Sequence, residues 1–551
     1  MRFIARFFLL ALTLSIGAAA VQAQQPKPFI LPVASAPGPS TWLLGQLYGN
    51  TVGAFLNGTR WYEAGQRLHF GLDFSMPCGT ELVAVADGQV GYADDSGFGS
   101  GPHNLILIHP QVGLTTLYGH LLDTPTLEPG TQVKQGDVVG YSGDPDVTCD
   151  SRPHLHFEVR SMDFVTAYNP VDYIDANWHA LTAIGSFSYP LFEQDLDNSR
   201  QWMSVDDQPI VTFWGRVLND YAAPYPDYRQ GLPPVNPPVA TTANPLPQNW
   251  QMRRLTYEGC CSGAWWVAPN RLYLIDGSVG QRAAIFEWNT AEGSLSSIVG
   301  QAPPPLLSPD GALQVERVDD QIIVRRVADG ASWTVETGNT LPAISADSSR
   351  LMWEVSRRDA GTPDGEPRTE IWVSNADGTN ARPVANEEGG YARWLDGSRL
   401  LVGARDTWTT TFKVVNTADD TSFTLGSWDR LRGMSIAPGG SRIMFYTVYA
   451  DDEATNGIYM LDTQPNAQPQ KMPFFGGWRW RDADSIFYIP YEPTSATQSL
   501  HHYDLLTGED RALTDSSFLV ANGDWSVSPS GDQIVFWNAN DLALWLIEAT
   551  P

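Results

Sequence analysis

Residues 153–160 read Pro153-His154-Leu155-His156-Phe157-Glu158-Val159-Arg160, a short β run that carries two histidines. Successive side chains of a strand point to opposite faces, so His154 and His156 share one face. Similar runs precede this one, and turn residues such as Asp87-Gly88 separate them. These runs lie at residues 81–86, 89–92, 104–108 and 114–118. The pattern predicts an all-β domain of about 110 residues, which is a normal domain size.

Two further clusters of polar residues lie in the same region. His69 and Asp73 flank Phe70-Gly71-Leu72, where Gly71 can bend the chain, and His120 follows Leu117-Tyr118-Gly119. Zinc prefers nitrogen, sulfur and carboxylate ligands in a tetrahedron, and a catalytic site leaves one position for water. Two imidazoles and a carboxylate are enough to hold the ion, and further histidines can move protons beside it. On strand geometry alone, both His154 and His156 could be ligands.

The 551-residue chain is too long for one hydrophobic core, so we expect two or three domains. Lys and Arg number 34 against 62 Asp and Glu, a net charge of −28, which argues against nucleic acid or an anionic membrane as a partner. Arg2 and Arg6 precede an apolar run, and Val21-Gln22-Ala23 fits signal-peptide cleavage. We expect an exported protein (periplasmic, cell-envelope or extracellular) without a transmembrane segment; an uncleaved anchor is the alternative.

Export permits disulfides, and the chain has four cysteines. Cys78 and Cys149 both lie in the histidine-rich region, and we expect them to pair, which would add about 4 kcal/mol of stability. Two free thiols are the alternative. Cys260 and Cys261 are adjacent and are equally compatible with a strained bridge and with two buried thiols.

Changes in composition divide the chain into six expected units. They are a signal peptide at 1–23, an extended aromatic- and glycine-rich segment at 24–60, the β domain at 61–178, a β-rich connecting segment at 179–221, a stiff proline-rich linker at 222–247 and a repeat domain at 248–551.

The repeat domain alternates Ser-Pro-Asp-Gly-like turns, such as Ser308-Pro309-Asp310-Gly311, with pairs of β runs. The turns recur at intervals of about 40 residues, the scale of one four-stranded propeller blade. Counting them favours seven blades over six. The last unit ends before a fourth strand, and residues 249–256 could supply that strand and close the ring.

The residues around the histidine clusters resemble the lysostaphin-type (LytM-like) zinc metalloendopeptidases over residues 68–173. The resemblance is carried by His69-x-x-x-Asp73, residues 77–90, Leu117-Tyr118-Gly119-His120-Leu121, residues 133–140 and residues 153–160. It implies that one zinc ion per catalytic domain is held by His69, Asp73 and His156, with His120 and His154 as the catalytic pair. The implied reaction is hydrolysis of peptide bonds in bacterial peptidoglycan crosslinks or stem peptides, often beside glycine.

The repeats resemble TolB-like propellers, which implies a module that positions the enzyme or binds a protein or glycan ligand. Two alternatives stay open: an envelope binding or scaffold protein that retains the peptidase fold without cleaving, and an extracellular protease that acts on proteins. Residues 144–152 depart from the family pattern, and their three aspartates favour a solvated acidic loop over a calcium loop. Residues 42–67 could cover the site as an inhibitory lid.

Five of the nine histidines remain outside this assignment, and four of them need a separate interpretation. We expect His103 and His109 to be ordinary surface or core residues. His501 and His502 form a tempting metal pair, but adjacent strand residues face opposite ways, so a surface location is favoured.

Overall fold

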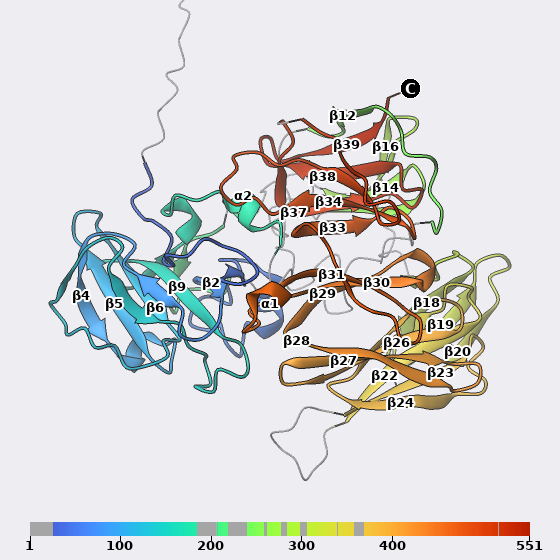
Figure 1. The fold of residues 1–551 in the computed structure, drawn as a ribbon, viewed down its shortest axis with the longest axis horizontal. Helices are drawn as coiled ribbons and strands as arrows, with labels where there is room; N and C mark the ends of the chain where they lie inside the picture. The colour runs from blue at the N-terminus through green and yellow to red at the C-terminus, as the bar shows by residue number, and fades with distance from the viewer. Residues whose placement is uncertain are drawn as a thin grey trace, which may run out of the picture.

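The computed structural model describes residues 26–184, 205–206, 208–218, 240–257, 262–276, 284–297, 306–338, 340–357, 368–515 and 517–550. A small β domain, blue to cyan in Figure 1, lies beside a β-propeller drawn in green to red. The predicted all-β class is confirmed, because α-helices are few and short among the described residues: α1 (Val52–Asn57) and α2 (Trp178–Leu181).

The first domain is built on an antiparallel sheet with the strand order β1-β2-β9-β6-β5-β4-β7. β10 and β11 extend this sheet beside β9, and β3 and β8 form a separate pair. The bounds are β1 Leu43–Leu44, β2 Leu72–Ser75, β3 Glu81–Val83, β4 Gly88–Ala93, β5 Asn104–His109, β6 Leu114–Gly119, β7 Gln132–Val133, β8 Val138–Tyr141, β9 His154–Ser161, β10 Thr166–Tyr168 and β11 Val211–Thr212.

Strand β9 is central to this sheet, and its alternating sequence sets the two faces of the sheet. Leu155, Phe157 and Val159 are fully buried in the hydrophobic core. The intervening side chains therefore point to the opposite face, where the two histidines lie. The register places His156 opposite Asp73 on β2 and opposite Gly119 at the end of β6. Three neighbouring strands thus carry the three polar clusters to one place.

The N-terminal segment, expected as a separate extended unit at 24–60, packs into the core of this domain. Phe29, Trp42 and Tyr48 are fully buried there, and β1 pairs with β2. Likewise β11, from the expected connecting segment at 179–221, pairs with β10. The sequence of the N-terminal segment has little periodicity, but its large aromatic side chains bury enough apolar area to hold it against the domain. A lid that opens freely from residue 42 onward is therefore not what the fold provides.

Seven four-stranded sheets form the propeller within the described residues, which confirms the predicted blade number. Six blades are consecutive along the chain. The first three are formed by β13 Ser262–Ala268, β14 Arg271–Asp276, β15 Ala284–Asn289 and β16 Ser294–Ser297; by β17 Leu306–Leu307, β18 Leu313–Val318, β19 Gln321–Arg326 and β20 Ser332–Val335; and by β21 Ala343–Ile344, β22 Arg350–Arg357, β23 Arg368–Asn375 and β24 Arg382–Glu388. The next three are formed by β25 Tyr391–Trp394, β26 Arg399–Asp406, β27 Thr409–Asn416 and β28 Ser422–Asp429; by β29 Leu431–Ile436, β30 Arg442–Thr447, β31 Gly457–Asp462 and β32 Gln470–Lys471; and by β33 Gly476–Trp480, β34 Ser485–Pro490, β35 His501–Asp504 and β36 Asp510–Ala512.

The seventh blade joins the two ends of the repeat domain. β37 (Val520–Val527), β38 (Gln533–Asn538) and β39 (Ala543–Ala549) come from the C-terminus, and β12 (Trp250–Arg254) pairs with β39. Residues 249–256 therefore supply the missing strand, as predicted, and the ring is closed by hydrogen bonds between the two ends of the propeller sequence.

The repeated turn motif has a local physical explanation. Ser308 Oγ donates a hydrogen bond to Asp310 Oδ1 (2.7 Å) and accepts one from the amide of Leu313 (2.8 Å), while Gly311 takes a positive φ of 71°. Ser345 and Asp347 make the same serine-to-aspartate bond in the next blade, also at 2.7 Å. In these two blades the motif thus ties the first strand to the second.

The propeller contacts the first domain directly. Tyr449 Oη donates a hydrogen bond to the carbonyl of Ser75 on β2 (2.7 Å), and the Tyr449 amide donates to Pro39 O (2.9 Å). Leu43 is buried in a propeller cluster, whereas its neighbour Leu44 belongs to the core of the first domain. Figure 1 shows the resulting arrangement of two adjoining bodies.

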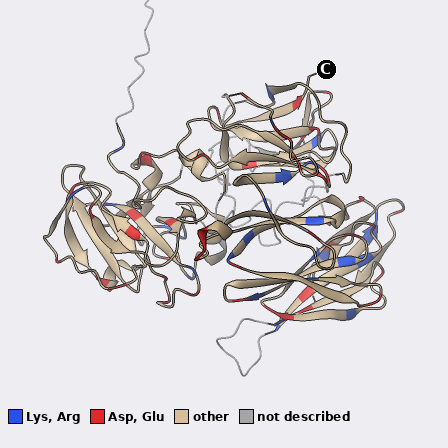
Figure 2. Cartoon of the chain, in the orientation of Figure 1, with Lys and Arg blue, Asp and Glu red and all other residues tan. Residues whose placement is uncertain are grey.

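Several expectations fall on residues outside the described ranges. They are the signal peptide at 1–23, Cys260 and Cys261, and most of the segments at 179–221 and 222–247. The described end of the proline-rich stretch lies on the propeller, where the Ala240 amide donates to Pro529 O (2.7 Å). Within the described residues, no helix has the length and apolar character needed to cross a membrane. Charged residues of both signs are spread over the two bodies in the view of Figure 2.

Candidate metal centre

Three donor atoms from two adjacent strands and the turn before them converge in the first domain. His69 Nε2 lies 3.2 Å from His156 Nδ1 and 3.3 Å from Asp73 Oδ1, and the last two atoms are 2.9 Å apart. His69 and His156 are buried, and the Asp73 side chain is 14% exposed. Among the described residues these three alone form a group with metal-ligand geometry. His154 is not in that group, although its Nε2 lies 3.8 Å from Asp73 Oδ1.

Outer hydrogen bonds fix which ring nitrogen of each histidine faces this centre. His69 Nδ1 lies 2.7 Å from the carbonyl of Leu47, so it donates a proton there and leaves the Nε2 lone pair free. His156 Nε2 lies 3.2 Å from Glu158 Oε1, which leaves its Nδ1 for the centre. Such partners orient ligand rings and raise their basicity.

Sequence reasoning gave Glu158 no role. Its carboxylate is fully buried and accepts hydrogen bonds from Arg160 at 2.6 Å and 3.0 Å in addition to that from His156. The signal was present in the sequence, since residues 156, 158 and 160 share one face of the strand. Leu47 could not be found in this way, because it contributes only a backbone carbonyl.

Gly71 lies in a bend directly before β2, as the sequence suggested, and it also makes room for a neighbouring ring. A Cβ atom at this position would lie 2.6 Å from His156 Cε1 and 2.8 Å from Phe157 O. The absence of a side chain therefore leaves the space that the His156 ring occupies.

His120 and His154 lie together beside the donor group. Their ring centroids are 4.7 Å apart, and the His120 and His156 centroids are 5.8 Å apart. His120 follows β6 with a positive φ of 57°, and its Nδ1 is hydrogen-bonded to the carbonyl of Gly101. His154 Nδ1 is bonded to the carbonyl of Arg152 at 2.6 Å. Both rings thus have Nδ1 occupied, which leaves Nε2 for other partners.

The pKa values of Asp73, His156 and His120 are shifted in different ways by their surroundings. Burial alone would raise the pKa of Asp73, but the surrounding histidines hold that pKa well below its usual value. Burial alone would lower the pKa of His156, yet its bonds to Asp73 and Glu158 raise it to about 9. Burial, with the charge of His154 adding to it, lowers the pKa of His120 to about 3. In the metal-free protein a proton on His156 balances the Asp73 charge, and a bound cation would displace that proton.

The remaining histidines lie elsewhere. His109 is buried in the core between Asp87 O and Thr116 Oγ1, and His103 is bonded to Asp94 at 2.8 Å. The surface location favoured for the pair at 501–502 is wrong for His502, which is 6% exposed on β35.

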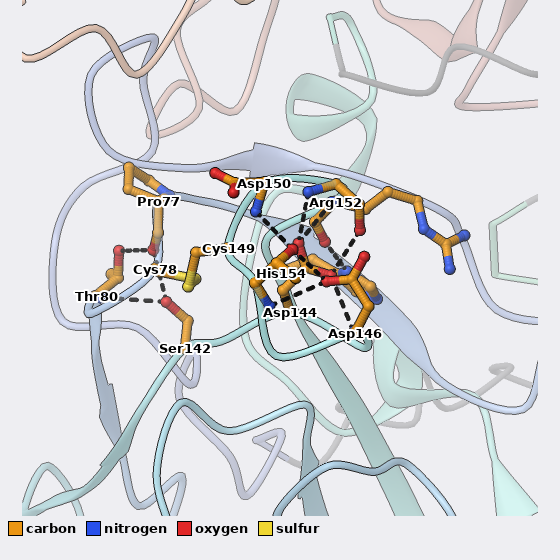
Figure 3. Close-up of a disulfide and its surroundings, with 12 residues drawn as sticks. Pro77, Cys78, Thr80, Ser142, Asp144, Asp146, Cys149, Asp150, Arg152 and His154 are labelled. Carbon is orange, nitrogen blue, oxygen red and sulfur yellow. Dashed lines mark hydrogen bonds between the residues drawn. A yellow bond between two sulfur atoms is a disulfide. The ribbon is translucent and has the colours of Figure 1, made fainter. Parts of the chain in front are cut away.

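A disulfide joins Cys78 to Cys149 and ties the loop before β9 to the chain after β2. Figure 3 shows this bond beside a network around Asp144, whose carboxylate accepts from the amides of Ser151 (3.0 Å) and Arg152 (2.8 Å). The solvated acidic loop predicted here is therefore wrong for Asp144, which is 1% exposed. This buried carboxylate organises the loop that holds His154 Nδ1.

Residues 60–69 also border the centre. The Tyr62 ring packs edge-on against His69 with centroids 5.5 Å apart. Two guanidinium groups lie over the Trp61 ring, those of Arg60 at 5.2 Å and Arg152 at 5.1 Å from its centroid. These contacts hold residues 60–69 beside the donor group.

A buried His-Asp-His donor set on an all-β sheet, with two more histidines beside it, defines a metallo-type hydrolase centre. Residues 67–171 match the model of Peptidase family M23, so the chain contains a domain of that family. The chain is 36% identical over 94 residues to the DD-carboxypeptidase/endopeptidase Mpg of Neisseria meningitidis, covering 17% of this chain and 20% of that protein. It is 31% identical over 109 residues to lysostaphin of Staphylococcus staphylolyticus, covering 19% and 22%.

The chain thus spans about a fifth of the length of these curated relatives. Among solved structures, a putative TolB from Agrobacterium tumefaciens is similar over 47% of this chain and 94% of that one, with 16% identity and a TM-score of 0.27.

Proposed function

We propose that this protein is an exported zinc-dependent metalloendopeptidase that hydrolyses peptide bonds in bacterial peptidoglycan crosslinks or stem peptides. The observation that carries the proposal is the convergence of His69 Nε2, Asp73 Oδ1 and His156 Nδ1, which lie 2.9–3.3 Å from one another. With zinc–ligand bonds of about 2.1 Å, tetrahedral donors are about 3.4 Å apart. The three donors therefore fit one zinc ion and leave a fourth position open.

The donor chemistry also favours zinc over the hard cations. Two imidazoles and one carboxylate suit zinc, whereas calcium and magnesium take mostly oxygen ligands. When bound, zinc lowers the pKa of a water ligand to about 7 and polarises the substrate carbonyl. The side chains assigned to the ion are His69, Asp73 and His156, with Leu47 O and Glu158 orienting the two rings.

His120 and His154 are the proposed catalytic pair. Burial lowers the pKa of both, so both rings are neutral at pH 7 and present an unprotonated nitrogen. One of them accepts a proton from the attacking water. The ring protonated in this way can return that proton to the leaving amine, and the second ring donates a hydrogen bond to the developing oxyanion once it carries a proton at Nε2. Because Gly101 O and Arg152 O hold Nδ1 of the two rings, proton transfer occurs at Nε2.

The proposed peptidoglycan substrate is supported by two relatives, a DD-carboxypeptidase/endopeptidase and lysostaphin. Both match the domain that carries these residues. We assign catalysis to residues 61–178 together with the N-terminal residues that pack on them. The propeller at 248–551 binds or positions a substrate or partner. Arg2, Arg6 and the Ala23 cleavage site support export, and the mass of the secreted chain tests it.

The decisive experiment digests purified peptidoglycan and a glycine-rich protein side by side, with a chelator control. His69→Ala and His156→Ala should lose zinc and activity together, whereas His120→Ala should lose activity and keep zinc. His103→Ala is the matched control, a histidine of the same domain that is bonded to Asp94 instead.

Each outcome selects one function. Cleavage of peptidoglycan alone supports the proposal, and cleavage of the protein alone favours an extracellular protease. Stoichiometric zinc without hydrolysis of either substrate points to the non-cleaving scaffold. Full activity in His120→Ala would refute the assigned roles.

A further inference from the structure

An exposed tryptophan is held in a strained backbone conformation beside the metal centre. Trp214 follows β11, is 78% exposed and has a φ of 61°. For a bulky side chain this left-handed conformation is unfavourable and persists only where the surroundings fix it. Trp214 lies outside residues 67–171, so it is an addition of this chain to the peptidase domain.

The surroundings fix this turn firmly. The Trp214 amide donates to Ala64 O (2.8 Å), and the buried Gln66 side chain accepts from the Thr212 amide (2.6 Å) and donates to Arg216 O (2.5 Å). Gln66 thus bridges both arms of the turn. The indole is therefore presented to solvent by a rigid backbone and not by a loose loop.

The turn is continuous with the catalytic site. Phe213 packs against Phe70 with centroids 5.2 Å apart, and Phe70 packs against the His156 ring at 5.6 Å. The Phe213 amide also donates to the carbonyl of Val165, which is 46% exposed. A ligand lying on Trp214 would therefore be two aromatic contacts from a metal-binding side chain.

The chemistry of this surface suits a sugar. Trp214 lies between Thr212 and Arg216 in the sequence, and both of these polar residues are exposed. A pyranose ring presents apolar C–H groups on its faces and hydroxyls at its edge, so it can stack on an indole while its hydroxyls bond to flanking polar groups. Trp61 offers no such surface, because Arg60 and Arg152 lie over its ring. A purely apolar partner would require a larger contiguous patch of exposed hydrophobic side chains.

We propose that Trp214 forms a glycan subsite that binds the amino-sugar backbone of the polymer whose peptides the domain cleaves. The inference rests on the proposed peptidoglycan hydrolase function, which it extends from the peptide to the sugar chain. Its role is to hold the polymer while the peptide branch reaches His120 and His154.

The test measures binding, not cleavage, in the full-length mature protein with a His120→Ala background. The probes are a soluble N-acetylglucosamine tetramer, followed by calorimetry, and purified sacculi, followed by pelleting. Trp214→Ala should weaken binding to both probes about tenfold, the effect of removing an aromatic anchor. Trp214→Gly should do the same while folding at least as well, since glycine accepts a φ of 61° without strain. Ile210→Ala is the control, an exposed apolar residue (58%) of the same segment.

Equal binding of the tetramer by parent and Trp214→Gly would overturn the proposal. So would a loss of binding confined to sacculi, because sacculi also present peptide branches that the tetramer lacks, and this pattern would indicate a peptide subsite. The outcome is separable from that of the parent function. Binding of the tetramer through Trp214 without any hydrolysis by the parent chain would support this subsite and refute the peptidase function. Hydrolysis of peptidoglycan without tetramer binding through Trp214 would support the peptidase function and refute the subsite.

Discussion

Replacing Gly71 by alanine should weaken metal binding although no proposed ligand residue is replaced. The new Cβ would lie 2.6 Å from His156 Cε1, whereas ordinary contact begins at 3.4 Å. The His156 ring must therefore move by about 0.8 Å, which exceeds the tolerance of about 0.5 Å for a functional constellation. Phe157 O, 2.8 Å from the same Cβ, is backbone of a central strand and cannot yield instead.

The displaced ring loses its alignment with both Asp73 and Glu158. We expect zinc affinity to fall by about 10- to 100-fold, the range seen when ligand orientation is disturbed, and the free energy of unfolding to fall by about 1–3 kcal/mol through overpacking. Competition with a chromogenic chelator measures the first quantity, and denaturant unfolding of the metal-free protein measures the second.

Gly140→Ala is the matched control for this substitution. Its Cβ would meet only the Leu121 methyl groups at 3.5 Å and 3.6 Å, which is ordinary contact. That variant should keep full zinc affinity and gain slight stability, because alanine restricts the unfolded chain. Wild-type zinc affinity and activity in Gly71→Ala would refute the argument that this glycine makes room for the ligand ring.

Three further outcomes follow from the contacts. Glu158→Gln should lower zinc affinity about tenfold, because a neutral amide no longer supports His156; unchanged competition titrations would contradict this. Tyr449→Phe should lower the free energy of unfolding by about 1–3 kcal/mol, because the buried carbonyl of Ser75 loses its donor; an unshifted thermal transition would show that the domains dock without it. Burial lowers the pKa of His109, so this group contributes stability above its unfolded pKa of about 6.5 that is lost as the pH falls. His109→Gln should therefore show a weaker decline in unfolding free energy below pH 6.5 than the parent chain.

The sequence predicted those features that depend on period and spacing. Alternation along 153–160 placed His154 and His156 on one face, and the turns at intervals of about 40 residues predicted the blades and the closing strand. Strand geometry alone left both histidines as possible ligands. In the structure His156, and not His154, joins His69 and Asp73 in the donor group, and the separate roles of the two histidines stay a prediction. The pattern of one strand could not reveal that difference, since it arises where β2 and β9 are in register.

Other features depend on backbone atoms or on empty space, which leave little trace in a sequence. The carbonyls of Leu47, Gly101 and Arg152 orient three of the histidines, and any residue type can supply a carbonyl. Likewise Gly71 was visible as a glycine, but whether it bends the chain or makes room for a ring depends on what packs against it. The N-terminal segment lacked periodicity because its residues are anchored singly, by Trp42 and its neighbours, and not as one face of a regular element.

The two-residue strand β1 explains why the propeller is more than a tethered module. Consecutive strand residues face opposite ways, so Leu43 enters the propeller core while Leu44 enters the core of the peptidase domain. β1 pairs with β2, where Ser75 lies two residues beyond Asp73 and accepts the hydrogen bond from Tyr449. One strand thus separates the Asp73 carboxylate from the propeller core. A linker alone would set only the spacing of the two domains, whereas this shared packing gives the propeller one position. Any ligand that the propeller binds would therefore be held at a constant distance from His120 and His154.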